Sequence, residues 1–263
     1  MRKNIAVVFG GKSCENEISI ITGVMAVNLL DPERYAAFPV YLSQAGDFYT
    51  GAALSDASSF RREGYLQKGK KALFCGQNLC TVHKNKIKTV AKIDCVLNCC
   101  HGMGGEDGAL SSLLDLNGIP NASPDAAPSA LFMDKTLTKL VAKALGVKTA
   151  PYFRIGEEEY RKRGAFALRV IEERLGYPVI VKPARQGSSI GITVAEDRAR
   201  LVAAIQAGFA YDDLLIAEKY FERRREINCA CYKSGDKDVV SPCEEPKTVH
   251  KFLTFGDKYL GGG

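Results

Sequence analysis

The chain has 263 residues, of which 46% are hydrophobic and 25% are charged, and these values are typical of a globular protein. No stretch approaches the roughly 20 apolar residues that cross a bilayer, and the apolar run after the N-terminus is too short for a signal peptide. We therefore expect a cytoplasmic protein that does not enter the membrane. The net charge of +6 is spread over the chain, and the one dense basic run, 223–225, favours a solvated turn over a nucleic-acid site.

The nine cysteines predict buried thiols rather than disulfides or a zinc site. Cys95, Cys99 and Cys100 lie in or beside an apolar strand, and Cys229 and Cys231 alternate along another. The sequence holds no CxxC pair, which a structural zinc site would normally supply. We expect these side chains to act as small apolar groups of the core.

The first part of the chain alternates predicted strands and helices. Apolar runs and helical spacing predict the order strand, helix, strand, strand, helix, over residues 4–11, 13–30, 36–43, 92–100 and 107–118. This alternation predicts an α/β layer with a parallel sheet. Residues 51–92 are more polar and less regular, with a hairpin expected around residues 72–90.

A second unit is expected to begin near Ser123. It opens with one long helical pattern, 123–146, and continues with two strands joined by a Gly/Ser loop in residues 177–197. A helix at 198–210, a strand at 213–221 and an antiparallel hairpin with its turn at 234–236 follow. We place the domain boundary between residues 122 and 123.

The stretch "FGGKS" at 9–13 resembles a phosphate-binding P-loop but lacks its first glycine, because Ala6 stands at that position. A tight glycine turn between a strand and a helix is also a common structural device. Glu15 and Ser19 follow it, one helical turn apart, at the carboxyl edge of the predicted sheet, where ligands bind in open α/β folds. A carboxylate there could hold a substrate ammonium group.

The octapeptide "HGMGGEDG" directly follows a predicted buried strand, so His101 lies at the same edge. We expect the loop to leave backbone N–H groups open to an anion at its four glycines, 102, 104, 105 and 108. Asp107 is expected to cap the helix that follows. An isolated histidine is often structural, but the surrounding glycines favour a ligand-binding role for His101.

"KPARQGSSIG" places Lys182 at the end of an apolar strand, before a loop of small residues. A lysine beside mobile N–H and hydroxyl donors can clamp phosphate, whereas the alternative is an exposed hairpin. Lys135 offers a second cation from a helix, although alone it would be an ordinary surface lysine. Further on, Glu218 ends one apolar strand and Glu226 begins the next apolar segment. Together with the two lysines, these carboxylates indicate a nucleotide site.

Six motifs occur in order and together resemble the motif series of D-alanine–D-alanine ligases: "VFGGKSCENEIS", "CCHGMGGEDG", "MDKTLTK", "VKPARQGSSIG", "AEKYFERRREINC" and "FGDKYL". The resemblance covers the whole chain. It implies a Rossmann-like pre-ATP-grasp domain over residues 1–122, followed over 123–263 by an ATP-grasp domain that is incomplete at its C-terminus. It also implies ATP-dependent joining of two D-alanines for peptidoglycan through an acyl phosphate, with small-molecule substrates, no nucleic-acid partner, and a homodimer.

The resemblance also implies roles for individual residues. Glu15, with Ser19 nearby, would hold the ammonium group of the first D-alanine, and His101 would lie near its carboxylate. Ser188 would hydrogen-bond to Tyr259 and Glu15 and link the clamp loop to the substrate. The implied ATP-binding residues are Lys135, Lys182, Ser188, Ser189, Glu218, Lys219, Phe221, Glu226 and Lys258. Among them the lysines would neutralise phosphates, Glu218 and the backbone of Lys219 and Phe221 would contact adenine, and Glu226 would bind ribose.

Two departures from the family pattern stand out. One extra residue separates Glu218 from Glu226, as in a hinge-loop variant. The sequence stops at "KYLGGG", and the carboxylates that hold Mg2+ in the family are expected beyond residue 263. No metal ligand is therefore predicted within the chain, and we expect weak nucleotide binding and no ligation from it.

Other functions are still open from the sequence. A relative that accepts D-serine or D-lactate as second substrate would share the same motifs. A non-catalytic nucleotide-binding fragment is a second alternative. A Rossmann dehydrogenase is weaker, because no GxGxxG follows the first strand.

Overall fold

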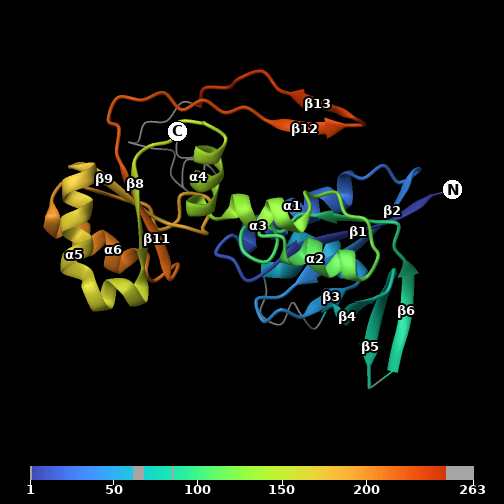
Figure 1. Ribbon diagram of the computed structural model, residues 1–263. Coiled ribbons are helices and arrows are strands. Elements are labelled where there is room, and N and C mark those ends of the chain that lie inside the picture. The colour runs from blue at the N-terminus through green and yellow to red at the C-terminus, as the bar shows by residue number, and fades with distance from the viewer. Residues whose placement is uncertain (1, 62–67, 85, 247–263) are drawn as a thin grey trace. The chain divides into compact units, whose positions relative to one another are not determined.

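The protein is described here by a computed structural model that covers residues 2–61, 68–84 and 86–246 (Figure 1). The chain divides into two compact units, residues 1–146 and 147–263. Each unit is described by itself. The predicted domain boundary after residue 122 stays a prediction.

The first unit is built on a seven-stranded sheet with the order β6-β5-β4-β3-β2-β1-β7. Strand β1 (Lys3–Gly10) pairs in parallel with both β2 (Tyr35–Leu42) and β7 (Cys95–Asn98), which confirms the parallel arrangement predicted for these segments. Because β1 lies between β2 and β7, the carboxyl ends of β1 and β7 are neighbours. The loops that follow these two strands therefore meet at one edge of the sheet.

Helices cover both faces of this parallel part. Side chains alternate along β1, so Ala6 and Val8 pack into one core with α2 (Ala109–Leu116), while Val7 and Phe9 pack into the other with α1 (Asn16–Leu29). The helix predicted over 123–146 is in fact two helices, α3 (Ala126–Met133) and α4 (Lys135–Ala144). Asp134 separates them, because its backbone is extended and its carboxylate caps α4 by accepting from Thr136 N and Leu137 N.

The polar stretch between β2 and β7 is more regular than the sequence predicted. It adds four antiparallel strands to the sheet, β3 (Phe48–Thr50), β4 (Lys70–Cys75), β5 (Asn78–His83) and β6 (Lys86–Lys92), with short 3-10 helices at Ala52–Ser55 and Ala57–Arg61. The hairpin expected around residues 72–90 is confirmed as β4–β5. Exposed lysines hide the alternation of β6, where most side chains face solvent.

The second unit holds an antiparallel sheet with the order β10-β9-β11-β8. Its strands are β8 (Tyr152–Gly156), β9 (Val179–Pro183), β10 (Thr193–Ala195) and β11 (Leu214–Lys219). Helices α5 (Glu157–Leu175) and α6 (Arg198–Gly208) bury one face of this sheet around Ile171, Val181, Ile205 and Leu215. Side chains alternate along a strand, so Ile180 and Lys182 of β9 lie on the opposite face.

A separate hairpin, β12 (Cys231–Ser234) and β13 (Lys237–Val240), confirms the predicted antiparallel pair. Its cysteines correct the prediction of buried thiols, because Cys229 and Cys231 are exposed, whereas Cys99 and Cys100 are buried as expected. All the cysteines are free thiols. Among the described residues, no helix combines the length and the apolar character needed to span a membrane.

Candidate functional site

Glu15 lies at the ligand-binding edge of the first unit. It directly precedes α1 and its side chain is deeply buried, with the residue only 3% exposed. Ser19, one turn later, accepts a hydrogen bond from Gly10 N at 2.7 Å and donates to Cys99 O at 2.7 Å. The Ser19 hydroxyl thus ties the ends of β1 and β7 to α1. A direct contact between Ser19 and a substrate stays a prediction.

The loop after β7 is held against Glu15. Ser13 Oγ donates to His101 O at 2.6 Å, which joins the segment before α1 to the histidine. Gly102 packs so closely that an added Cβ would lie 2.8 Å from Glu15 Oε2 and 2.9 Å from Ser13 Cβ. The structure therefore brings together Glu15 and His101, two residues that the sequence assigned to one substrate site.

The imidazole of His101 is oriented by α1. Its Nε2 lies 3.0 Å from Thr22 Oγ1, and the same hydroxyl donates its hydrogen to Ile18 O at 3.0 Å. Because a hydroxyl has one hydrogen to give, Thr22 accepts from His101 Nε2–H. The half-buried ring lies on the wall of a cavity of about 540 Å³ whose lining also includes Glu106, Ser123 and Phe132.

The backbone of this loop corrects the expectation of open anion-binding amides. Gly102 N donates to Glu106 Oε2 at 2.7 Å, Gly104 N donates to Asp107 Oδ2 at 2.8 Å, and Gly105 N donates to Gly102 O at 3.2 Å. The two carboxylates of the motif thus accept from the amides of Gly102 and Gly104, and a backbone carbonyl accepts from that of Gly105. Asp107 also accepts from Ala109 N at 3.0 Å, but the N-cap of α2 is Gly108, so Asp107 lies one residue before the capping position that the sequence predicted for it.

Two buried thiols border the same edge. Burial raises the pKa of Cys99 to about 11 and that of Cys100 to about 12. Both side chains are therefore protonated at neutral pH, and neither supplies a thiolate nucleophile beside His101. A role for the Glu15 carboxylate and the His101 ring in the chemistry of this edge stays a prediction.

Lys135 begins α4 in the first unit, and its side chain is half-buried. The preceding Asp134 fixes the start of the helix through its capping bonds. The contact of Lys135 with phosphate stays a prediction.

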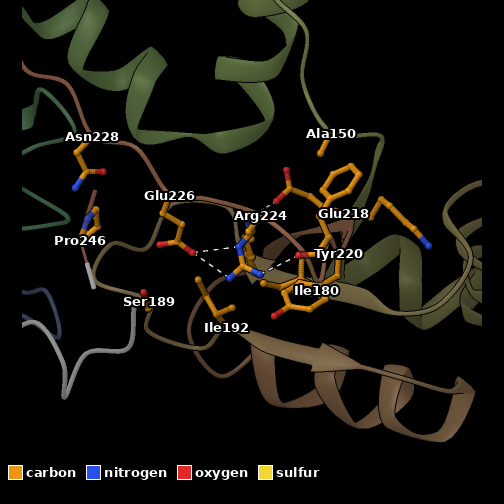
Figure 2. Close-up of a pocket in the computed structure, with 13 residues that line it drawn as sticks. Ala150, Ile180, Ser189, Ile192, Glu218, Tyr220, Arg224, Glu226, Asn228 and Pro246 are labelled. Atoms are coloured by element: carbon orange, nitrogen blue, oxygen red, sulfur yellow. Dashed lines mark hydrogen bonds and ion pairs between the residues drawn. The ribbon is translucent and has the colours of Figure 1, made fainter. Parts of the chain in front are cut away.

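The second unit has a cavity of about 480 Å³ on the helix-free face of its sheet (Figure 2). Many of the residues predicted to bind ATP line it: Lys182, Ser189, Glu218, Lys219, Phe221 and Glu226. Further lining residues are Ala150, Ile180, Ile192, Tyr220, Arg224, Asn228 and Pro246. The apolar members offer surfaces for a flat ring and the charged members offer partners for its substituents, as in a small-ligand site.

Lys182 and Glu218 form an ion pair across two neighbouring strands. Lys182 of β9 pairs in register with Ile216, and Glu218 of β11 pairs with Ile180, so the two charges are diagonal neighbours on the cavity face. The Nζ of Lys182 contacts Glu218 Oε2, and the two side chains are only 25% and 8% exposed. The pair thus places a cation and a carboxylate side by side on the cavity wall.

The loop between β9 and β10 carries Ser188 and Ser189 with positive φ angles of 47° and 60°. This conformation is uncommon for residues other than glycine. Ser189 lines the cavity, as the sequence predicted. The substrate contact of Ser188 stays a prediction.

The segment after β11 forms a second wall. Lys219 N donates to Pro151 O at 3.0 Å, and its ammonium group donates to Tyr177 O at 3.2 Å, so this side chain is held within the unit. Burial, followed by the Glu172 carboxylate, raises the pKa of that neighbouring Tyr177 to about 12. The fixed position of Lys219 is consistent with a role for its backbone rather than its charge.

Arg224 is a lining residue that sequence reasoning missed. The solvated turn predicted for 223–225 holds for Arg225, whose side chain is 74% exposed and pairs with Glu245. It is wrong for Arg224, whose side chain is 26% exposed and pairs with Glu226. In a run of three arginines, no sequence signal shows which one turns inward.

Two predicted residues, Lys258 and Tyr259, lie outside the described residues. Within residues 2–61, 68–84 and 86–246, no group of three His, Cys, Asp or Glu side chains could hold a metal ion.

Comparisons with known proteins agree with this geometry. The family model "D-ala D-ala ligase N-terminus" matches residues 4–124, and "D-ala D-ala ligase C-terminus" matches residues 141–263. The D-alanine–D-alanine ligase of Thermosipho melanesiensis is 36% identical over 99% of this chain and 70% of the relative. That of Caldicellulosiruptor bescii is 35% identical over 97% of this chain and 70% of the relative.

Solved structures show the same fold. The crystal structure of D-alanine–D-alanine ligase from Helicobacter pylori has a TM-score of 0.78 and 29% identity, and covers 94% of this chain and 76% of that one. The VanG D-Ala:D-Ser ligase from Enterococcus faecalis has a TM-score of 0.80 and 26% identity, and covers 98% of this chain and 74% of that one. With both parts matched by family models and more than two thirds of its relatives covered, the chain belongs to the D-alanine–D-alanine ligase family, whose structures have the ATP-grasp fold.

Proposed function

We propose that this protein ligates two D-alanines to D-alanyl-D-alanine at the expense of ATP, for peptidoglycan precursor synthesis in the cytoplasm. The observation that carries the proposal is the cavity of the second unit, where the buried Lys182–Glu218 pair and Glu226 lie among apolar residues. Relatives that are 35–36% identical over nearly the whole chain are named D-alanine–D-alanine ligases.

In this proposal the cavity of the second unit takes ATP. Glu218 accepts from the adenine amino group, the backbone at Lys219 and Phe221 borders the ring, and Glu226 accepts from ribose hydroxyls. The ammonium group of Lys182 donates to the phosphates and neutralises part of their charge, and Ser189 donates to them from its loop. Ser188, Lys135 and Lys258 complete the phosphate contacts. Cations and hydroxyl donors suit this task because charge spreads over the phosphoryl oxygens as they transfer.

The first unit takes the amino acid. Glu15 holds the ammonium group of the first D-alanine, and His101 lies near its carboxylate. Ser188 and Tyr259 link this substrate to the clamp loop through hydrogen bonds. The carboxylate is phosphorylated by ATP, the amine of the second D-alanine attacks the acyl phosphate, and phosphate leaves. The enclosed loops would exclude water, which otherwise hydrolyses the acyl phosphate.

A coupled assay tests the function. The purified chain is incubated with ATP, Mg2+ and D-alanine, and both phosphate release and dipeptide are measured, with L-alanine as control. Mg2+ is included because the family resemblance implies it. Phosphate and dipeptide in equal amounts, only with D-alanine, would support the proposal and contradict the sequence-based expectation that this chain does not ligate. Nucleotide binding without phosphate release would favour the non-catalytic alternative and the sequence-based expectation of no ligation.

The second substrate is a separate question, because the VanG D-Ala:D-Ser ligase has the same fold. We propose D-alanine as the acceptor, since family resemblance places a tyrosine at the position of Tyr259 in enzymes that make D-alanyl-D-alanine. Offering D-alanine, D-serine and D-lactate together and separating the products by mass spectrometry decides this. A predominance of the D-serine or D-lactate product would contradict it.

A homodimer belongs to the same proposal. Helix α1 exposes an apolar stripe at Ile21, Met25 and Leu29, which are 60%, 55% and 74% exposed and lie one turn apart. Such a stripe on a surface helix supports association with a second copy. Light scattering of the protein and of Met25→Glu tests it, and a monomer in both would contradict it.

A further inference from the structure

Arg224 has an unusual environment for an arginine in a basic run. It enters the cavity wall and lies between Glu226 and Tyr220 (Figure 2). Its Cζ is 4.9 Å from the ring centroid of Tyr220, which is itself 7% exposed. A guanidinium stacked on a buried ring at this distance is attracted by the π-electrons and restricted in its motion.

The guanidinium of Arg224 donates to the carboxylate of Glu226, the residue that binds ribose in the proposed function. Its Nε and Nη2 donate to Glu226 Oε1 at 3.2 and 3.0 Å. Both bonds end on the same oxygen, so this pair makes no use of Oε2. Glu226 is thereby oriented by one oxygen while the other can accept from a ligand hydroxyl.

The third nitrogen of the Arg224 guanidinium contacts the segment that follows β11. Nη1 donates to Phe221 O at 3.0 Å, so one side chain joins the carboxylate to the backbone that borders the cavity. Burial alone would lower the pKa of Arg224, but hydrogen bonds to Tyr220 and Glu226 raise it above its ordinary value. The side chain thus stays cationic inside the cavity.

Its two neighbours differ from it. Arg225 pairs with Glu245 on the surface, and Arg223 does not line the cavity. Arg224 is therefore the arginine of this run that lines the cavity. Arg223 serves as a control, because its substitution removes the same charge from outside the cavity.

We propose that Arg224 is a positioning residue for nucleotide recognition, which holds Glu226 so that its carboxylate accepts from the ribose hydroxyls. This inference rests on the proposed function and adds to it a residue that makes the site selective for ribonucleotides with both hydroxyls. Arg224 acts through its hydrogen bonds to Glu226 and to the carbonyl of Phe221, and it does not bind the phosphates itself. The planar guanidinium is needed because its three nitrogens donate hydrogen bonds in fixed directions, which a lysine ammonium group cannot reproduce.

The test compares ATP with 2′,3′-dideoxyATP by isothermal titration calorimetry. The unmodified protein should prefer ATP by about tenfold or more, the worth of one hydrogen bond to a charged group. In Arg224→Ala, ATP affinity should fall about tenfold while dideoxyATP affinity changes less than about threefold. Arg224→Lys keeps the charge but not the fork, and should resemble Arg224→Ala. Arg223→Ala should match the unmodified protein.

A double variant tests whether Arg224 acts through Glu226. Glu226→Gln should lose the same preference, and Arg224→Ala/Glu226→Gln should lose little more than either single variant, because both act on one contact. Thermal melts followed by circular dichroism verify that each variant is folded, and Arg224→Lys replaces the alanine variant if that one is not.

The possible results distinguish the positioning role from the proposed function. An unchanged preference for ATP in Arg224→Ala, an equal loss for both nucleotides, or full recovery in Arg224→Lys would overturn the positioning role while leaving the proposed function intact. Failure of the unmodified protein to bind either nucleotide would instead overturn the proposed function and this inference with it.

Discussion

The two units prepare their candidate sites in different ways. At the edge of the first unit, the polar groups of the glycine loop bind one another: Glu106 and Asp107 accept from the amides of Gly102 and Gly104, and Ser13 donates to His101 O. In the cavity of the second unit, charged side chains pair across the wall, as Lys182 with Glu218 and Arg224 with Glu226.

The two sites should therefore respond to different kinds of substitution. The first site depends on backbone shape, so a change of volume should disturb the fold before it disturbs any ligand. The second site depends on charges held by a rigid sheet, so a change of charge should weaken ligand binding more than stability. Substitutions in each unit test this distinction.

The largest effect is expected from Gly102→Ala. Gly102 has a φ of +68°, and a Cβ would approach Glu15 Oε2 to 2.8 Å. The left-handed conformation costs roughly 1–2 kcal/mol and the overpacking a further ~1–3 kcal/mol. We expect the free energy of unfolding to fall by about 2–5 kcal/mol in urea titrations.

Gly104→Ala is the matched control. Gly104 also has a positive φ, +89°, but nothing lies within 4 Å of an added Cβ. Only the conformational cost of roughly 1–2 kcal/mol should appear. Equal losses in the two variants would show that the close approach to Glu15 is not a packing constraint.

Lys182→Met tests the charged cavity. Loss of a charge-assisted contact of about 1.5–3 kcal/mol should weaken ATP binding tenfold or more. It also removes the ion-pair partner of Glu218, whose side chain is 8% exposed, and so lowers stability. In Lys182→Met/Glu218→Gln the stability should return while ATP affinity stays low. Calorimetry and thermal melts measure the two properties, and recovery of both together would contradict the phosphate role of Lys182.

Glu15→Gln should have a smaller and more selective effect. The substitution keeps the volume that Gly102 packs against but removes the charge that faces the substrate ammonium. D-alanine affinity should fall about tenfold, as for one charged hydrogen bond, and ATP affinity should hold. Equilibrium dialysis with each ligand provides the measurement. A parallel loss of both ligands would indicate a folding defect and count against the role of Glu15.

How far the sequence predicted the molecule depends on the scale of the feature. Apolar periodicity predicted β1, α1, β9 and β11, because their buried faces repeat in the sequence. Helix α5 was not predicted, although its acidic first turn, Glu157, Glu158 and Glu159, is typical of a helix start. Its backbone is non-helical at Arg163, so the helix is not regular along its whole length. The split at Asp134 was missed because a capping residue looks like any polar residue inside a helical pattern.

The site shows the same limit. The sequence assigned Lys182 and Glu218 to one nucleotide site, but it did not show that β9 and β11 pair antiparallel in the register that makes the two side chains diagonal neighbours. The self-bonded amides of Gly102 and Gly104 and the inward turn of Arg224 depend on contacts between loops, which no local pattern records. The roles of the predicted residues toward substrate are chemistry that only ligand experiments can test.

The smallest effect should come from the thiols. At pH 8, Cys99 and Cys100, with pKa values of about 11 and 12, should be thiolate in only about 10⁻³ and 10⁻⁴ of molecules, and they are buried as well. Exposed Cys229, Cys231 and Cys243 of the second unit should therefore be alkylated first by iodoacetamide. Peptide mass spectrometry of a time course measures each rate. Early labelling of Cys100 would show that the first edge opens in solution and would contradict its rigid, self-bonded description.

The same thiols predict how stability depends on pH. Their folded-state pKa values lie above the ordinary value of 9.0, so the folded state binds the proton more tightly than the unfolded state. The stabilisation is complete below about pH 9 and is lost progressively as pH rises from 9 toward 11 and 12. In Cys100→Ala, the alkaline decline should be shallower than in the unmodified protein, whereas Cys229→Ala should leave it unchanged. Urea titrations between pH 8 and 10.5 measure both slopes, and identical slopes in all three proteins would show that burial of Cys100 does not couple to its ionisation.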